Sequence, residues 1–289
     1  MSDYKNLFTG NEILACIDGS SVSTAVCDYS SWIAGIVERP LKLIHSIENN
    51  PEAPLVDYSG AIGLGSQDEL LSELIEVEQS RASLMIKKGQ LMLNAAKESA
   101  VNAGVTNVSI YQHHGTLAES LIELEDDIRV LVMGIRGKEH DSQSEGIGHQ
   151  LETVIRSLHK PILVVNEEFT EPKKAMLAYD GSAACVKALQ MVISSKLFKK
   201  IPCHLVHVGD GAEALLSEAS DKLIQAGIEV TAVQLEGEAD EALAKYQIEN
   251  DIGIMLMGAF SHNKFRDFLL GSFTAKMLEK TNRPLLLLR

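Results

Sequence analysis

The feature that most constrains the fold of this 289-residue chain is that its second half repeats its first. An apolar run that ends in Asp-Gly-Ser and leads into a helical pattern occurs twice, and its aspartates, Asp18 and Asp180, lie 162 positions apart. His45 and His207 stand in the next apolar run of each copy and are also 162 positions apart. Self-similarity at one fixed offset predicts two copies of one structural unit.

Two later landmarks repeat in the same order. Apolar runs that end in Met-Gly place Gly134 and Gly258 124 positions apart, and the prolines before the last apolar runs, Pro161 and Pro284, are 123 positions apart. Because the offset falls by 38 between the second and third landmarks, the first copy carries about that much extra chain between them.

The extra chain of the first copy has two parts. An insert at about 48–66 is rich in proline, glycine and acidic residues, and a long helical pattern follows at about 67–102. Apolar residues recur in that pattern at spacings of three, four and seven, namely Leu74, Val77, Leu84, Leu91 and Ala95. The glycine-spaced YSGAIGLG stretch inside the insert has three readings: a lid over a pocket, a partner surface, or a surface loop with no special role.

Short apolar runs alternate with helical patterns through each copy, which predicts parallel sheets covered on both faces. We therefore expect an α/β fold of two tandem, doubly wound, five-stranded parallel-sheet domains, the first over 1–168 and the second over 172–289. The polar, proline-containing NEEFTEPKK stretch lies between them. In the second copy we expect strands near 174–179, 202–208, 228–234, 252–257 and 284–288 and helices near 182–197, 211–226, 238–249 and 271–281.

Composition narrows the possible partners. The formal net charge of −14 argues against nucleic acid, because phosphate backbones are bound through surplus Lys and Arg. No segment approaches the roughly 20 apolar residues that span a bilayer, and the N-terminus lacks the layout of a signal peptide. We therefore expect no membrane partner and a cytoplasmic location.

Cysteine and histidine placement gives no sign of a metal site. The four cysteines have no CxxC spacing, and two of them stand inside apolar runs, so we expect buried, reduced thiols. His113 and His114 are adjacent on a predicted strand and would point to opposite faces, which makes a poor chelating pair.

In doubly wound folds, ligands bind outside the carboxyl ends of the strands, at the point where the strand order reverses. This rule selects the two Asp-Gly-Ser turns. In one reading they are structural turns in which Ser20 or Ser182 caps the following helix. In the other, the carboxylates of Asp18 and Asp180 face the crevice and bind a base or a sugar.

The same rule selects the glycine-containing loop after the fourth strand. In the second copy Gly258 ends that strand, and Gly271 and Ser272 begin the last helix. The amides and macrodipole of a helix N-terminus favour phosphate. The alternative is a solvated loop with a capped helix.

These features together resemble the universal stress protein family, in its tandem two-domain form. They are the two strand–Asp-Gly-Ser–helix units, the strands ending in Met-Gly, the glycine loops and the closing apolar strands introduced by Lys-Pro or Arg-Pro. The resemblance covers the chain apart from the insert and implies a fold of the adenine nucleotide α-hydrolase-like type. Many members bind ATP through Gly-x-x-Gly, nine residues and Gly-Ser or Gly-Thr, together with the Asp that ends strand one; others lack the motif and bind no ATP.

The second copy keeps most of this motif. Asp180, Gly258, Gly271 and Ser272 match it, whereas Ser261 stands where the family has glycine. Serine is small and can still face a phosphate, so the departure weakens the match without abolishing it.

The first copy departs further. Asp18, Gly134 and Gly137 match, but ten residues rather than nine separate Gly137 from Gly148, and His149 follows instead of Ser or Thr. The intervening segment holds three carboxylates, which disfavour a triphosphate unless a divalent cation bridges them. We therefore rank the second copy above the first as a nucleotide site.

The resemblance implies a cytoplasmic stress-response protein that binds ATP or a related adenine nucleotide, with or without Mg²⁺, and acts as a sensor on an unidentified regulatory protein partner. The alternative is an interaction or scaffold protein of the same fold that binds no nucleotide. Nothing in the sequence suggests a catalytic nucleophile, so we expect weak ATP hydrolysis at most. In the family the final strands pair across a dimer; we expect this pairing between the halves of the chain, and homodimerisation of the whole chain.

Overall fold

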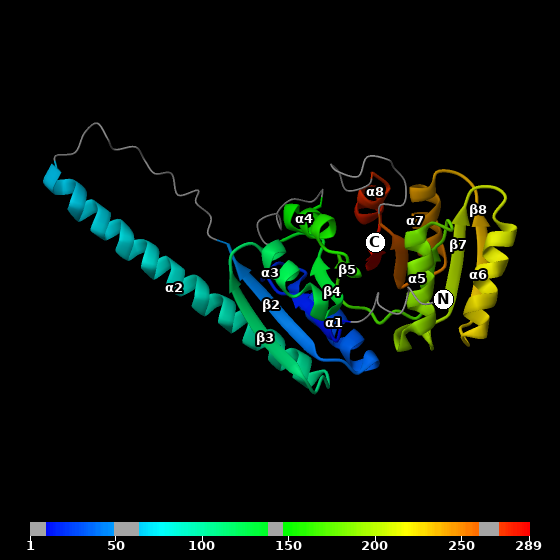
Figure 1. Cartoon of the computed structure of the whole chain (residues 1–289), viewed down its shortest axis with the longest axis horizontal. Coiled ribbons are helices and arrows are strands. Elements are labelled where there is room, and N and C mark those ends of the chain that lie inside the picture. The colour runs from blue at the N-terminus through cyan, green and yellow to red at the C-terminus, as the bar shows by residue number, and fades with distance from the viewer. Residues whose placement is uncertain (1–9, 49–63, 138–146, 260–271) are drawn as a thin grey trace.

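The computed structural model describes residues 10–48, 64–137, 147–259 and 272–289, with side chains described from residue 72 within the second range. Ten strands form a single sheet, in the order β3-β2-β1-β4-β5-β10-β9-β6-β7-β8 (Figure 1). The first half contributes β1 (Glu12–Cys16), β2 (Leu41–Ile47), β3 (Val108–His114), β4 (Ile128–Gly134) and β5 (Ile162–Val165). The second half contributes β6 (Ala175–Ala178), β7 (Cys203–Val208), β8 (Val230–Leu235), β9 (Ile254–Gly258) and β10 (Leu285–Leu288).

Helices cover both faces of this sheet. One face carries α1 (Ser23–Val37), α2 (Leu64–Asn102), α5 (Ala183–Ser194) and α6 (Glu213–Gln225). The other carries α3 (Leu117–Glu123), α4 (His149–Ser157), α7 (Ala239–Glu249) and α8 (Ser272–Lys280). Alternate residues of the central strands enter one core or the other, as Ile13 and Leu14 do, which explains why these strands are largely apolar rather than alternating.

All strand pairs within each half are parallel, and each half has the doubly wound order that the sequence predicts. The halves join through β5 and β10, which pair antiparallel with Leu163 opposite Leu286. The expectation that the last strands pair within the chain is thus confirmed. Because this one pair is antiparallel, the carboxyl ends of the strands point to opposite edges of the sheet in the two halves, and so do the two crevices.

The chain that connects the halves, between β5 and β6, is anchored on α1. The ring of Phe169 packs edge-on against Tyr29, with centroids 4.8 Å apart, and lies 6.4 Å from Trp32. The hydroxyl of Tyr29 lies 3.3 Å from the carbonyl oxygen of Thr170. The connection is therefore packed against the first half.

The elements of the second copy agree with the prediction within about three residues at each end. The expected helix over 182–197 instead ends at Ser194, where Ser195 turns the chain into a separate 3₁₀ turn over Lys196–Phe198. All four cysteines are free and buried, as predicted.

The helical pattern predicted at 67–102 forms α2, which has 39 residues, whereas its counterpart α6 has 13. The insert before α2, including YSGAIGLG, falls almost wholly outside the described residues. Among the helices that are described, none combines the length and apolarity required to cross a membrane.

Candidate functional site

The aspartates that follow the first strand of each half make the same turn. Oδ1 of Asp18 accepts hydrogen bonds from the backbone N–H of Ser20 at 2.9 Å and from the hydroxyl of Ser23 at 2.7 Å. Oδ1 of Asp180 accepts from the N–H of Ser182 at 2.9 Å. Each Asp is thus held by its own turn, which fixes the position of the carboxylate at the carboxyl edge of the sheet.

The two turns differ in how they start the next helix. Ser182 caps α5, since its hydroxyl accepts from the N–H of Cys185 at 3.3 Å, as predicted. The prediction that Ser20 caps α1 is wrong: α1 begins at Ser23, its N-cap is Val22, and none of the described side chains caps it. The first copy has two more residues in its turn, and Ser23 bonds back to the aspartate.

A histidine supports each turn from the neighbouring strand. Nδ1 of His45 lies 2.7 Å from the carbonyl oxygen of Ile17, and Nδ1 of His207 lies 2.8 Å from that of Tyr179. A carbonyl oxygen only accepts, so Nδ1 carries the proton in both rings. The residue before each aspartate is therefore tied to the second strand.

The glycines that end the fourth strands make room for the start of the first helix of their own half, α1 or α5. A Cβ on Gly134 would lie 2.5 Å from Cγ2 of Val22, and one on Gly258 would lie 2.7 Å from Cβ of Ala184 and 3.3 Å from the amide N of Cys185. Both glycines also line a crevice. Close helix packing alone thus accounts for both of them.

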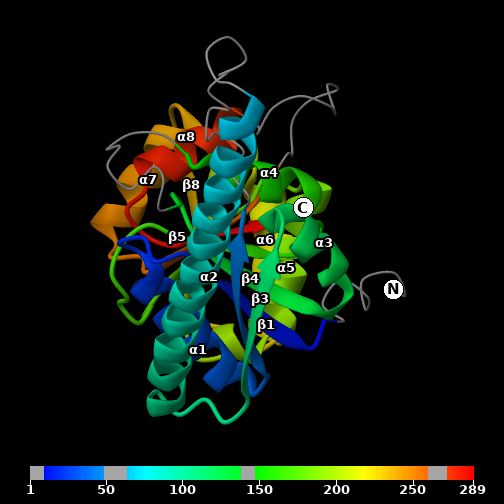
Figure 2. The same cartoon turned by 90° about the vertical axis from the view of Figure 1, so that its left-hand side faces the viewer.

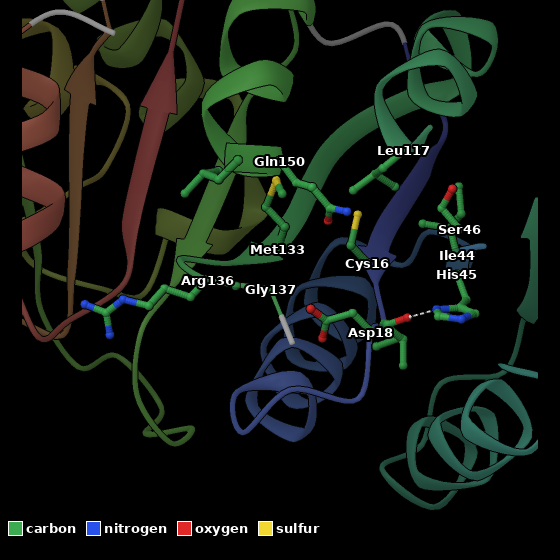
Figure 3. A pocket seen from close by; sticks show the side chains of 13 residues that line it. Cys16, Asp18, Ile44, His45, Ser46, Leu117, Met133, Arg136, Gly137 and Gln150 are labelled. Carbon is green, nitrogen blue, oxygen red and sulfur yellow. Dashed lines mark hydrogen bonds between the residues drawn. The ribbon is translucent and has the colours of Figure 1, made fainter. Parts of the chain in front are cut away.

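The crevice of the first half is floored by the ends of β1, β2 and β4 (Figure 3). The Asp18 carboxylate faces Gly137: a Cβ there would lie 3.4 Å from Oδ2 of Asp18 and 3.7 Å from Oε1 of Gln150. The guanidinium of Arg136 points away from the pocket in the same view. Gly137 therefore leaves open space between a carboxylate and an amide.

The N-terminus of α4 closes the same crevice. Gly148 is its N-cap, and among the described residues no side chain caps the helix. The N–H of Gly148 donates to the carbonyl oxygen of Ile135 at 2.9 Å, which fixes the helix start beside the end of β4. A Cβ on Gly148 would lie 3.2 Å from Cα of Arg136, so a glycine fits this close approach. The first amides of α4 lie at the rim of the crevice that contains Asp18.

A second carboxylate lies at the mouth of this crevice. Oε1 of Glu48 accepts from Nε2 of Gln150 at 3.2 Å and from the N–H of Leu117 at 3.4 Å. From the opposite side α2 contributes Met85, Lys88 and Met92, and the outer cleft between them has a volume of about 450 Å³. The mouth is therefore lined by apolar thioethers as well as by groups of both charges.

The crevice of the second half is more apolar and has a volume of about 170 Å³. Asp180, His207 and Phe273, which lies in the first turn of α8, line it. Its remaining lining is largely apolar and comprises Ala178, Tyr179, Cys185, Val206, Val208, Ala239, Leu243, Met257 and Gly258. Ser272 begins α8 and is exposed, while Ser261 and Gly271 lie outside the described residues.

The thiols at the floors of the two crevices are poor nucleophiles. Burial raises the pKa of Cys16, and the nearby Asp18 carboxylate raises it further. Burial also raises the pKa of Cys185. Since the thiolate is the reactive form of cysteine, neither thiol is suited to covalent chemistry at neutral pH.

The structure thus brings together Asp18, Gly134, Gly137 and Gly148 in the first half, and Asp180 with Gly258 in the second. Sequence reasoning did not assign the histidines to these sites, although their offset of 162 equals that of the aspartates. No repeated residue type marks Ser23, Glu48, Gln150 or Phe273, because the equivalent position in the other copy holds a different residue.

A five-stranded, doubly wound unit with an Asp turn and a helix N-terminus at the switch point, present twice in one chain, defines a tandem protein of the doubly wound α/β class. Residues 11–166 and 209–289 match the universal stress protein family. A universal stress protein of Synechocystis sp. is 36% identical over 284 residues, which cover 96% of this chain and 99% of that protein. This chain belongs to the universal stress protein family.

Solved structures support the fold. A universal stress protein from Archaeoglobus fulgidus DSM 4304 superposes with a TM-score of 0.73 at 18% identity, covering 98% of this chain and 99% of that one. A functionally unknown protein from Pseudomonas aeruginosa PAO1 superposes with a TM-score of 0.59 at 14% identity, covering 98% and 93%. The whole two-unit arrangement is therefore found in other proteins.

Proposed function

We propose that this universal stress protein binds ATP or a related adenine nucleotide in its two carboxyl-edge crevices and acts as a cytoplasmic sensor on a regulatory protein partner. In each half the Asp carboxylate would bind the sugar or base and the helix N-terminus the phosphates. Weak ATP hydrolysis is the most that the inert thiols and the turn-bound aspartates support.

The observation that carries this proposal is the N-terminus of α4. It lacks a side-chain cap among the described residues, begins with a glycine, and lies at the crevice that contains Asp18. First-turn amides, which have no partner within the helix, and the helix dipole favour an anion. Gly137 leaves space for the sugar or base of a ligand between the Asp18 carboxylate and Gln150.

We propose that the second half holds the stronger site. Its crevice has an aromatic ring, Phe273, and aliphatic walls that suit a purine base. Ser272 supplies a hydroxyl at the start of α8, where the first half has His149. The mouth of the first crevice instead holds the Glu48 carboxylate, which repels phosphate unless Mg²⁺ lies between them.

The Glu48 carboxylate also favours a second function for the first half. It bonds the side chain of Gln150 on the first turn of α4 and the N–H of Leu117 at the start of α3. A carboxylate that already lies near two helix N-termini takes the place of an external anion. In this alternative the first half is an interaction module that binds no nucleotide.

The test is to denature protein purified without added nucleotide and to separate the released small molecules by chromatography. Release of ATP, ADP or AMP, together with a rise in melting temperature on addition of millimolar Mg-ATP, is the expected result. A blank chromatogram with an unchanged melting temperature would contradict nucleotide binding and leave the interaction protein as the function.

A further inference from the structure

The long helix α2 leaves the body of the protein partway along its length (Figure 1). Its C-terminal part packs on β2 and β3 through Gly89, Leu93 and Ala100, which are buried. Every described side chain from Ser72 to Met85 is exposed. Figure 2 shows that no other described helix or strand lies over the outer face of α2. Most of the stability of a helix in a protein comes from packing of one face. The described side chains of the projecting part have no such packing.

The exposed part carries a regular apolar stripe. Leu74 is 50% exposed, Leu84 66% and Leu91 71%, and Val77 between them is 61% exposed. Their spacings of three, seven and seven residues fit a heptad in which Leu74 takes position a and the other three take position d. A stripe with this spacing is typical of the seam of a coiled coil.

The two halves of this stripe carry opposite charge. Residues 72–79 contain three acidic side chains, Glu73, Glu76 and Glu78, and residues 80–91 contain three basic ones, Arg81, Lys87 and Lys88. Arg81 and Lys88 occupy the two remaining a positions of the heptad. Two copies of this helix that run antiparallel therefore place acidic residues beside basic ones.

We propose that α2 is a docking surface for α2 of a second copy of this chain, paired antiparallel about a two-fold axis between residues 82 and 83. In this register Leu74 packs against Leu91 of the second copy, Val77 against the stem of Lys88, and Leu84 against the stem of Arg81. The acidic part of each helix then lies along the basic part of the other. The interface is isologous and closes as a dimer.

A parallel pair is disfavoured by the same charges. It would place Arg81 opposite Arg81 and Lys88 opposite Lys88 at the centre of the seam, and it would align the three glutamates. Like charges at facing positions of a coiled coil select against a pairing. Since α6 has only 13 residues, the surface belongs to the first half alone and is an addition to the shared fold.

The first measurement is the mass of the full chain in solution by light scattering. The proposal predicts about twice the chain mass of 31.5 kDa at micromolar concentration. A monomeric mass would overturn the proposal. It would do so even if α2 of that monomer bound a helix of a different protein.

Charge reversal then tests the surface. One variant carries Glu73→Lys, Glu76→Lys and Glu78→Lys, and a second carries Arg81→Glu, Lys87→Glu and Lys88→Glu. Each is expected to be monomeric alone, and an equimolar mixture of the two is expected to recover the dimer mass. Recovery of the dimer on mixing also shows that the single variants are folded and have lost only their pairing. Two dimeric single variants, or a mixture that stays monomeric, would overturn the proposal.

A matched control reverses three exposed acidic residues on α6, namely Glu213, Glu218 and Asp221. This variant is expected to remain dimeric. If it too became monomeric, non-specific charge effects would explain the loss and the surface would not be α2.

Spin labels test the direction of pairing, because the four native cysteines are buried. In the proposed dimer the two Ser83→Cys labels lie close to the two-fold axis and are about 2 Å apart along the helix direction. The two Glu98→Cys labels are about 45 Å apart along the same direction. The proposal therefore predicts a short interlabel distance for the first and a long one for the second. Equal distances at both positions would indicate a parallel pair and overturn it.

Discussion

Nδ1 of His207 lies 2.8 Å from the carbonyl oxygen of Tyr179, directly before Asp180. The first half repeats this contact with His45 and Ile17 at 2.7 Å, directly before Asp18. Each contact joins the second strand to the residue that precedes the aspartate at the end of the first strand. The duplicated landmarks of the sequence are thus the groups that position one carboxylate in each crevice.

The first prediction concerns these two rings. Because the carbonyl partners only accept, both histidines are expected to be the Nδ1–H tautomer when neutral. Long-range ¹H–¹⁵N NMR spectra at pH 8 distinguish the two ring nitrogens directly. A protonated Nε2 in either neutral ring would contradict the geometry.

The second prediction concerns the glycines at the crevice. Gly258→Val places atoms within 2.7 Å of Ala184 and against the backbone of α5, and is expected to lower the free energy of unfolding by about 1–3 kcal/mol. Gly137→Ala meets ordinary contacts at 3.4 Å and 3.7 Å and is expected to change it by at most about 0.5 kcal/mol. Urea unfolding of the two variants measures both values. Equal losses would contradict the assignment of Gly258 to close packing.

The third prediction is a pH dependence in the second half. Burial lowers the pKa of His204, with a smaller contribution from Lys174, and Nδ1 of this ring lies 2.8 Å from the hydroxyl of Tyr246. Below the ordinary pKa of about 6.5, the unfolded chain binds a proton that the folded chain does not. Stability is therefore expected to fall as the pH drops from about 6.5 towards the lowered pKa of the folded state.

The replacement His204→Asn removes this titration and serves as the comparison. The loss of unfolding free energy between pH 7.5 and pH 5.5 is expected to be smaller in the variant than in the unchanged chain. A variant with an unchanged slope would contradict the role of His204.

Much of the fold could be predicted because the duplication supplies two readings of each element. Four landmarks at constant or explained offsets indicated the duplication, and the apolar runs of the second copy indicated where its strands and helices lie along the chain. The cap of α1 could not be predicted, because the two Asp-Gly-Ser turns are identical in sequence while α1 begins later than α5, relative to its turn.

The long helix shows the limit of periodicity most clearly. The sequence indicates an apolar stripe at Leu74, Val77, Leu84 and Leu91, yet a different stripe containing Gly89 and Leu93 packs on the sheet. The spacing of apolar residues predicts a helix without saying which of two stripes meets the body. The joining of the halves by β5 and β10 was predictable only through the family, since apolar end strands do not specify a partner.

The site could be predicted only in outline. The aspartates and glycines follow from the switch-point rule, but Glu48 and Phe273 enter the crevices through tertiary packing that no local pattern encodes. The two crevices consequently differ more in their walls than in their turns.

Calorimetric titration of Mg-ATP into the full chain and into Asp180→Ala tests the account most directly. We predict saturable binding to the unchanged chain and a loss of at least about tenfold in affinity in Asp180→Ala, which corresponds to about 1.4 kcal/mol. The loss in Asp18→Ala is expected to be smaller. The control Asp221→Ala, an exposed carboxylate on α6, should bind as the unchanged chain does. Binding of equal affinity in all four proteins, or no heat of binding in any of them, would contradict a nucleotide site at these aspartates.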